Sequence, residues 1–152
     1  MKLMLSQLAS VVPTASKTYT LSSCTFTSAW VQGTVVSSDA QGFTLDDGSG
    51  ATPLVVLQSR GSEVAAEEVQ LGEYLLVMGK LGQRKAPKRD EGGEEVRSKR
   101  PRVWQLAARK VKVLSRGSEG RRWAELWRHE VGALHAHVYP ELARQAVRPV
   151  PS

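Results

Sequence analysis

The side chains that could carry catalytic or metal chemistry are few, and their spacing does not bring them together. His129, His135 and His137 lie near the C-terminus, and the last two point to different sides of a helix, so they cannot share a metal ion as an i, i+4 pair would. Cys24 is the only cysteine, which excludes a disulfide within the chain and zinc sites built on cysteine pairs, and indicates a reducing compartment. The sequence therefore predicts no enzyme activity, no metal site and no cofactor.

One glycine-rich segment, Asp46-Asp47-Gly48-Ser49-Gly50, is a candidate phosphate-binding loop. It lacks the Lys-Ser/Thr ending of a P-loop, and the segment that follows, 53–57, has the pattern of a strand and not of a helix. A hairpin turn is the preferred interpretation, with Asp46 and Asp47 as turn residues and not as an acid–base pair.

Positive charge is concentrated in one stretch of the chain. The formal net charge is +6, and the segment 80–102 contains nine basic and four acidic residues, so it accounts for nearly all of the excess. Such a segment raises the expectation of a polyanionic partner, and the candidate phosphate contacts are Arg84, Lys85, Lys88 and Arg89. The run Lys99, Arg100, Pro101 and Arg102 fits a short nuclear import signal, with a solvated charge run as an equal alternative.

The elements that must position these residues begin with three strands. Strand patterns cover 30–36, 43–46 and 53–57, with a glycine-rich turn between the second and third. Gly33 lies inside the first strand, as expected of a strand that bends sharply to join both halves of a small barrel. These features predict a mainly β chain with a single five-stranded OB-fold barrel.

The remaining elements complete this architecture. A fully buried fourth strand is expected over 74–78, and a fifth, with one basic outward face, over 103–114. A short N-terminal helix is expected before Pro13, a helical turn near 63–69, and a C-terminal helix over 121–139 that ends at Pro140. The expected organisation is an N-terminal extension over 1–28, the barrel over 29–116 with a disordered basic loop at 83–101, the C-terminal helix over 118–139 and a tail over 140–152.

Aromatic residues help to decide between nucleic acid and protein as the partner of such a barrel. OB barrels stack bases on aromatics of the second and third strands, and here those strands contain only Phe43. A stripe of Trp123 and Trp127 on the C-terminal helix is by default core, yet a single helix has only part of the barrel to cover, so its surplus apolar edge indicates a protein partner. No apolar run approaches the roughly 20 residues that span a bilayer, so we expect a soluble protein without membrane contact.

Several short blocks, in this order, resemble the RecQ-mediated genome instability protein 2 family. They are Ala29-Trp30-Val31-Gln32-Gly33-Thr34-Val35-Val36, Tyr74 with Val77-Met78-Gly79, Leu126-Trp127, Glu130-Val131 and Leu134-His135. The resemblance implies the small OB-fold subunit of a nuclear complex that joins a RecQ helicase to topoisomerase III and dissolves double Holliday junctions. Direct pairing is then expected with the C-terminal OB fold of the larger genome-instability subunit, and DNA binding is expected to be weak or indirect.

The same resemblance assigns candidate partner-binding residues. Packing of the C-terminal helix against the larger subunit gives a role to Trp123, Trp127, Val131, Leu134 and His135. Trp30 and Lys110 are expected to lie where the pair faces the helicase or other repair proteins. The alternative function is that of a small single-stranded-DNA-binding OB protein, such as a telomere or replication factor A-type subunit.

Overall fold

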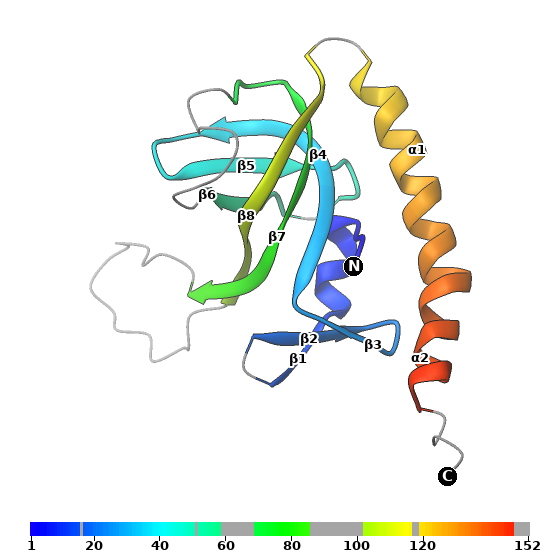
Figure 1. Ribbon diagram of the computed structural model, residues 1–152. Coiled ribbons are helices and arrows are strands. Elements are labelled where there is room, and N and C mark those ends of the chain that lie inside the picture. The colour runs from blue at the N-terminus through cyan, green and yellow to red at the C-terminus, as the bar shows by residue number, and fades with distance from the viewer. Residues whose placement is uncertain (16, 51, 59–68, 86–101, 117–118, 148–152) are drawn as a thin grey trace.

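A computed structural model describes residues 1–15, 17–50, 52–58, 69–85, 102–116 and 119–147. Figure 1 shows a β-barrel, a small sheet below it that is formed by the N-terminal strands, and a C-terminal helix that runs along one side of both. The described part of the chain is therefore one body in which the first and last segments flank the barrel.

Five strands close the barrel in the order β4-β5-β6-β8-β7, which confirms the predicted OB architecture. Neighbouring strands of the barrel are antiparallel, except that β6 runs parallel to β8. The bounds of the five strands are β4 Ser28–Ser38, β5 Gly42–Asp46, β6 Leu54–Gln58, β7 Tyr74–Lys85 and β8 Arg102–Ser115.

Closure depends on β4, the one strand that pairs in both halves of the barrel. Its first half pairs with β7 up to Thr34, and its second half pairs with β5 from Thr34 onward. Gly33 lies at this transition, where an added Cβ would be 2.9 Å from the backbone oxygen of Asp46. The glycine therefore permits a close approach of β4 to β5 at the position where the sequence pattern indicates a sharp bend.

The hairpin between β5 and β6 confirms the turn interpretation of the glycine-rich segment. Asp46 Oδ1 accepts a hydrogen bond from the Gly48 amide at 2.9 Å, and Gly48 and Gly50 have positive φ angles of 76° and 84°. Asp47 has a further role that its sequence position did not reveal. Its buried carboxylate accepts a hydrogen bond from the Leu5 amide at 2.6 Å and so ties the N-terminal segment to the barrel.

The N-terminal extension is an integral part of the fold. The expected helix is a six-residue 3₁₀ helix, Leu5–Ser10, and a three-stranded sheet follows it. Side chains from both reach the barrel core, which is formed by Leu3, Leu5, Leu8, Val11, Tyr19, Ala29, Val31, Val35, Phe43, Leu45, Leu54, Val56, Val69, Leu75, Val77, Leu81, Leu106, Ala108 and Val111. The three strands of the small sheet are β1 Val12–Ala15, β2 Thr18–Leu21 and β3 Cys24–Phe26.

The sequence predicted that the apolar run that opens β7 is fully buried, and this prediction is wrong for two of its residues. Leu75 and Val77 point inward and are inaccessible, whereas Leu76 and Met78 lie on the outer face and are half-buried. Leu76 packs against the cluster beneath the C-terminal helix. The run lacks alternation because the helix covers the outer face of the sheet at this point.

The predicted basic loop begins later than expected. Strand β7 continues to Lys85, which pairs with Arg102, so residues 83–85 belong to the β7–β8 ribbon and not to a loop. The rest of the predicted loop, with Lys88, Arg89 and the first three residues of the import signal, lies outside the described residues. The helical turn expected near 63–69 also falls almost entirely outside them.

The C-terminal helix continues beyond the predicted end at Pro140. It consists of α1 Gly120–Ala133, a π-helical turn over Leu134–Val138 and α2 Tyr139–Val147. The Tyr139 amide donates to the Leu134 carbonyl, five residues back, so the wider turn places Pro140 in the first turn of α2, where its missing N–H and fixed φ are tolerated. The predicted tail over 140–152 is thus helical to Val147. None of the described helices is long and apolar enough to cross a membrane.

Two glycines of β7 provide a matched test of the barrel packing. A Cβ on Gly79 would lie 2.1 Å from the Ala107 oxygen, whereas one on Gly82 would lie 3.8 Å from the nearest atoms, in the Gln105 side chain. We expect Gly79→Ala to lower the free energy of unfolding by at least about 2 kcal/mol, because β8 would have to move. Gly82→Ala should change it by less than about 1 kcal/mol in the same urea titration. Equal effects of the two substitutions would contradict the register of β7 with β8.

Candidate partner-binding surface

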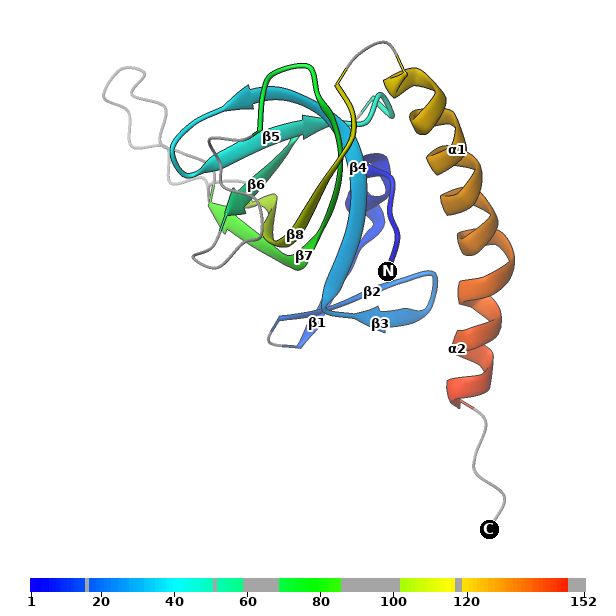
Figure 2. The same ribbon diagram turned by 45° about the horizontal axis from the view of Figure 1, so that its top comes forward.

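The inner face of the C-terminal helix is buried against the barrel. Trp127 and Val131 of α1 are 3% and 0% exposed and form a cluster with Met4, against which Trp30 of β4 and Leu76 of β7 pack. Figure 2 shows the helix standing beside β4 along most of its length. This second apolar cluster, separate from the barrel core, fixes the helix to its own chain.

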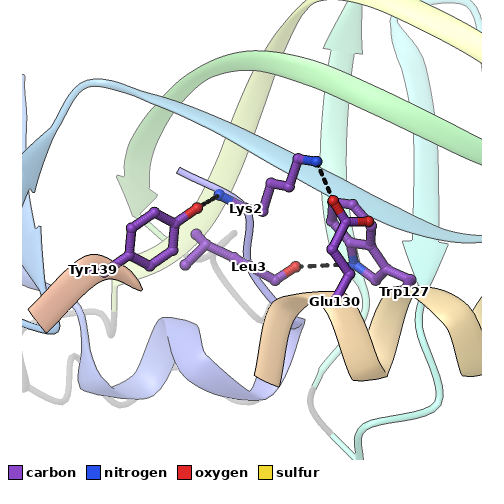
Figure 3. Close-up of polar contacts among 5 residues, drawn as sticks. All are labelled: Lys2, Leu3, Trp127, Glu130 and Tyr139. Atoms are coloured by element: carbon purple, nitrogen blue, oxygen red, sulfur yellow. Dashed lines mark hydrogen bonds and ion pairs between the residues drawn. The ribbon is translucent and has the colours of Figure 1, made fainter. Parts of the chain in front are cut away.

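The N-terminal segment, residues 1–4, lies between β4 and the helix and makes hydrogen bonds to both. On the barrel side, the Trp30 amide donates to the Met1 carbonyl at 2.8 Å, and the Leu3 amide donates to the Trp30 carbonyl at 2.9 Å. On the helix side, the Trp127 indole N–H donates to the Leu3 carbonyl at 3.3 Å, and the Lys2 amide donates to the Tyr139 hydroxyl at 3.0 Å (Figure 3). The segment thus acts as an interlayer that joins the helix to the sheet.

Two charged groups of this interlayer, the Lys2 ammonium and the Met1 amino group, make further contacts. The Lys2 ammonium forms an ion pair with Glu130 and lies 5.7 Å from the centre of the Trp127 ring (Figure 3). The Met1 amino group donates to the Ser28 carbonyl at 2.9 Å, and burial lowers the pKa of this amino group. Lys2 therefore contributes through its backbone, its charge and its cation–π contact at once.

His135 joins the π-helical turn to two other parts of the chain. Its Nε2 lies 2.8 Å from the Lys2 carbonyl and its Nδ1 lies 2.7 Å from the Ser22 hydroxyl. Because a carbonyl only accepts, Nε2 carries the proton that forms the first bond. The ring also makes an edge contact with Tyr139, whose carbonyl accepts a hydrogen bond from the Cys24 thiol at 3.0 Å. This histidine therefore holds the helix to the small sheet.

The outer face of the helix carries exposed apolar side chains. Trp123, Leu126, Val138 and Leu142 are 38%, 59%, 42% and 50% exposed, and Leu134 is half-buried between them. Their spacing of three or four residues within each half of the helix places neighbours on one side. We call these five residues the outer stripe. It is an apolar surface that the rest of the described chain leaves uncovered.

The residues assigned to partner binding from the sequence thus divide into two groups. Trp123 and Leu134 lie on the outer stripe, and Lys110 is exposed on β8. The other four lie on the inner side, where Trp127 and Val131 are buried and Trp30 and His135 are half-buried. The sequence assignment did not include Leu126, Val138 or Leu142, although their helical spacing relative to Trp123 and Leu134 is a signal that finds them.

The surface used by OB barrels to stack bases has no exposed aromatic here. Phe43, the one aromatic of β5 and β6, is 3% exposed and belongs to the barrel core. Of the predicted phosphate contacts, Arg84 is exposed near the end of β7, while the side chain of Lys85 is not described. Base stacking on β5 and β6 thus has no support from their side chains.

Titratable groups in the described part of the chain do not form a metal site. No three of its His, Cys, Asp and Glu side chains lie close enough to hold a metal ion. Among these groups, Tyr74 has the clearest change in pKa. Burial raises the pKa of its phenol above the usual range, and the Asp47 carboxylate adds a smaller effect in the same direction. This phenol lies 4% exposed at the start of β7, so its shift accompanies packing.

Comparison with known proteins agrees with this architecture. The model of the RecQ-mediated genome instability protein 2 family matches residues 1–135. A search of curated proteins found no match. Among solved structures, a chain of the S. pombe Stn1-ten1 complex is similar at 13% identity and a TM-score of 0.64, covering 95% of this chain and 96% of that one. A chain of a replication protein A heterotrimer bound to ssDNA is similar at 16% identity and a TM-score of 0.59, covering 87% and 91%. These two similarities show the OB fold.

Two tryptophans of one helix distinguish the inner face from the outer stripe. We expect Trp127→Ala to lower the free energy of unfolding by about 3 to 5 kcal/mol, because it empties the cluster beneath the helix and removes the hydrogen bond to Leu3. Trp123→Ala should cost less than about 1 kcal/mol, since this ring is partly in water. Urea unfolding followed by circular dichroism measures both. Similar costs at the two positions would show that the helix does not dock by the face described.

Proposed function

Because this chain belongs to the RecQ-mediated genome instability protein 2 family, we propose that it is a non-catalytic OB-fold scaffold subunit of a RecQ helicase–topoisomerase III complex. In this role it helps to dissolve double Holliday junctions in the nucleus by binding other proteins. It pairs directly with the C-terminal OB fold of the larger genome-instability subunit, and topoisomerase III and the helicase join through that pair. The observation that carries the proposal is the outer stripe, an apolar surface on a helix that is already fixed to its own barrel.

The outer stripe has the composition of a pairing surface. Trp123 supplies a large aromatic anchor and Leu126, 59% exposed, an aliphatic one beside it, and such side chains contribute strongly when they enter a partner's pocket. A helix held by the inner cluster offers these side chains without a further cost of ordering the backbone. A second helix lying along the stripe would cover it, as expected for two OB folds that pair through their C-terminal helices.

The inner residues then act as support for this surface. Trp127 and Val131 fix the position of the helix, and His135 fixes its π-helical turn, so substitutions there weaken pairing by displacing the outer stripe. Two similar folds come from structures described as a Stn1-ten1 complex and a replication protein A heterotrimer, that is, from assemblies of several chains. Assembly with other chains is the common feature that favours a scaffold role.

Removal of exposed side chains tests this proposal. We expect Trp123→Ala combined with Leu126→Ala to weaken pairing with the larger subunit by at least about a hundredfold, because anchors at the centre of an interface dominate its affinity. Titration of the purified larger subunit by isothermal calorimetry measures the change. The matched control is Val12→Ala combined with Leu71→Ala, which removes two apolar side chains that are 58% and 67% exposed elsewhere on the surface.

The control variant should pair as the unchanged chain does. If the stripe variant keeps its circular dichroism spectrum and still pairs with undiminished affinity, the proposed interface is wrong. Loss of pairing in both double variants would equally contradict it, since the effect would then not belong to the helix.

A further inference from the structure

The outer face of the β7–β8 ribbon carries charge of one sign. The two strands contain three and four basic residues, respectively, and no Asp or Glu. The five of these cations whose side chains are described are all exposed: Lys80, Arg84, Arg109, Lys110 and Lys112. None of them takes part in an ion pair within the described part of the chain. Most protein surfaces mix both signs, so this face is unusual.

Strand geometry places the five cations on one side of the ribbon. In β7, Leu75, Val77 and Leu81 point into the barrel, so Lys80 and Arg84 point out. In β8, Leu106, Ala108 and Val111 point inward. The alternation shifts between the last two of these, which makes room for two successive outward cations.

A β-bulge causes this shift. Met78 pairs with Lys110 and Gly79 pairs with Ala108, so Arg109 has no partner opposite it. Arg109 and Lys110 are consequently both exposed, although neighbours in a regular strand face opposite sides. The bulge increases the density of positive charge at the middle of the ribbon.

The cations form a row of considerable length. Lys112 lies opposite Leu76 and Arg84 lies eight residues further along β7, which corresponds to about 26 Å at about 3.3 Å per residue. Figure 1 shows β7 and β8 side by side across the barrel, with α1 beyond one end of the pair. A row of this length can follow several consecutive phosphates of a nucleic acid backbone.

We propose that this ribbon face binds the phosphate backbone of DNA without reading its sequence. Three of the five cations are lysines, which are depleted at protein interfaces, and the face has no exposed aromatic anchor. Trp104 points inward, where the centre of its ring lies 5.3 Å from the centre of the Tyr19 ring. With no ring on which bases can stack, the contacts are to phosphates, and duplex and single strands are both ligands. The surface differs from the β5 and β6 face on which OB barrels stack bases, and it does not depend on the proposed pairing.

Neutralisation of three ribbon cations tests the proposal in the full chain. The ribbon variant combines Lys80→Gln, Arg109→Gln and Lys112→Gln. It leaves unchanged Lys110, which the family resemblance assigns to a partner-facing surface, and Arg84, which lies near the end of β7. The control variant combines Lys17→Gln, Arg128→Gln and Arg144→Gln, three exposed cations outside the ribbon, and changes the net charge equally.

Fluorescence polarisation with labelled duplex and single-stranded DNA at several salt concentrations measures binding. We expect the ribbon variant to bind at least about tenfold more weakly at low salt, and its plot of log affinity against log salt to be shallower by about 2 to 3, since each lost phosphate contact removes close to one unit. The control variant should keep the affinity of the unchanged chain within about threefold.

Three results would overturn the proposal. The first is no binding by the unchanged chain at low salt, and the second is an equal loss in the ribbon and control variants, which would reflect net charge alone. The third is displacement of the DNA by a poly-glutamate peptide as efficiently as by unlabelled DNA of the same charge, which would identify an acidic protein segment as the ligand. Retained pairing of the ribbon variant with the larger subunit separates this outcome from a failure of the proposed function.

Discussion

The position of the C-terminal helix depends on the first four residues of the chain. This segment pairs through its backbone with Trp30 on one side. On the other side it accepts hydrogen bonds from Trp127 and His135 and donates one to the Tyr139 hydroxyl. A helix that follows the last strand of a barrel has few contacts of its own, because a cylinder touches a curved sheet along a narrow line. The interlayer widens this line and supplies the polar partners that the buried indole of Trp127 and the half-buried imidazole of His135 need.

The consequence is a helix with two distinct faces. The inner residues are used within the chain, so they determine where the helix lies, while the outer stripe is left for a protein partner in our proposal. The π-helical turn contributes to this division. It carries His135 to its contacts with Lys2 and Ser22, and Tyr139, directly after it, accepts a hydrogen bond from the Cys24 thiol of the small sheet. It also allows the helix to continue through Pro140, so that α2 contacts β3. The ribbon of β7 and β8 offers a third surface, which the bulge at Arg109 makes more basic.

The barrel could be predicted from the sequence because its signals are local: alternation in β4, a glycine at the bend and a glycine-rich turn before β6. The helix was predicted in place but not in length, since Pro140 stops a helix only when the preceding turn is regular. The sequence could not show that Trp127 is buried while Trp123 is exposed. Helical periodicity places both side chains near one stripe, but it does not show which edge of that stripe contacts the sheet. The N-terminal interlayer and the role of Asp47 depend on contacts between residues far apart in sequence, and no local pattern indicates them.

The central claim is that the helix docks on its own barrel through the N-terminal interlayer before any partner binds. Hydrogen–deuterium exchange of the isolated chain tests it most directly. The account predicts that amides from Trp127 to Tyr139 exchange at least about a hundredfold more slowly than in an unstructured chain, because the helix opens only when its inner cluster is lost. Exchange of these amides at the rate of an unstructured peptide, with the barrel strands still protected, would contradict the account.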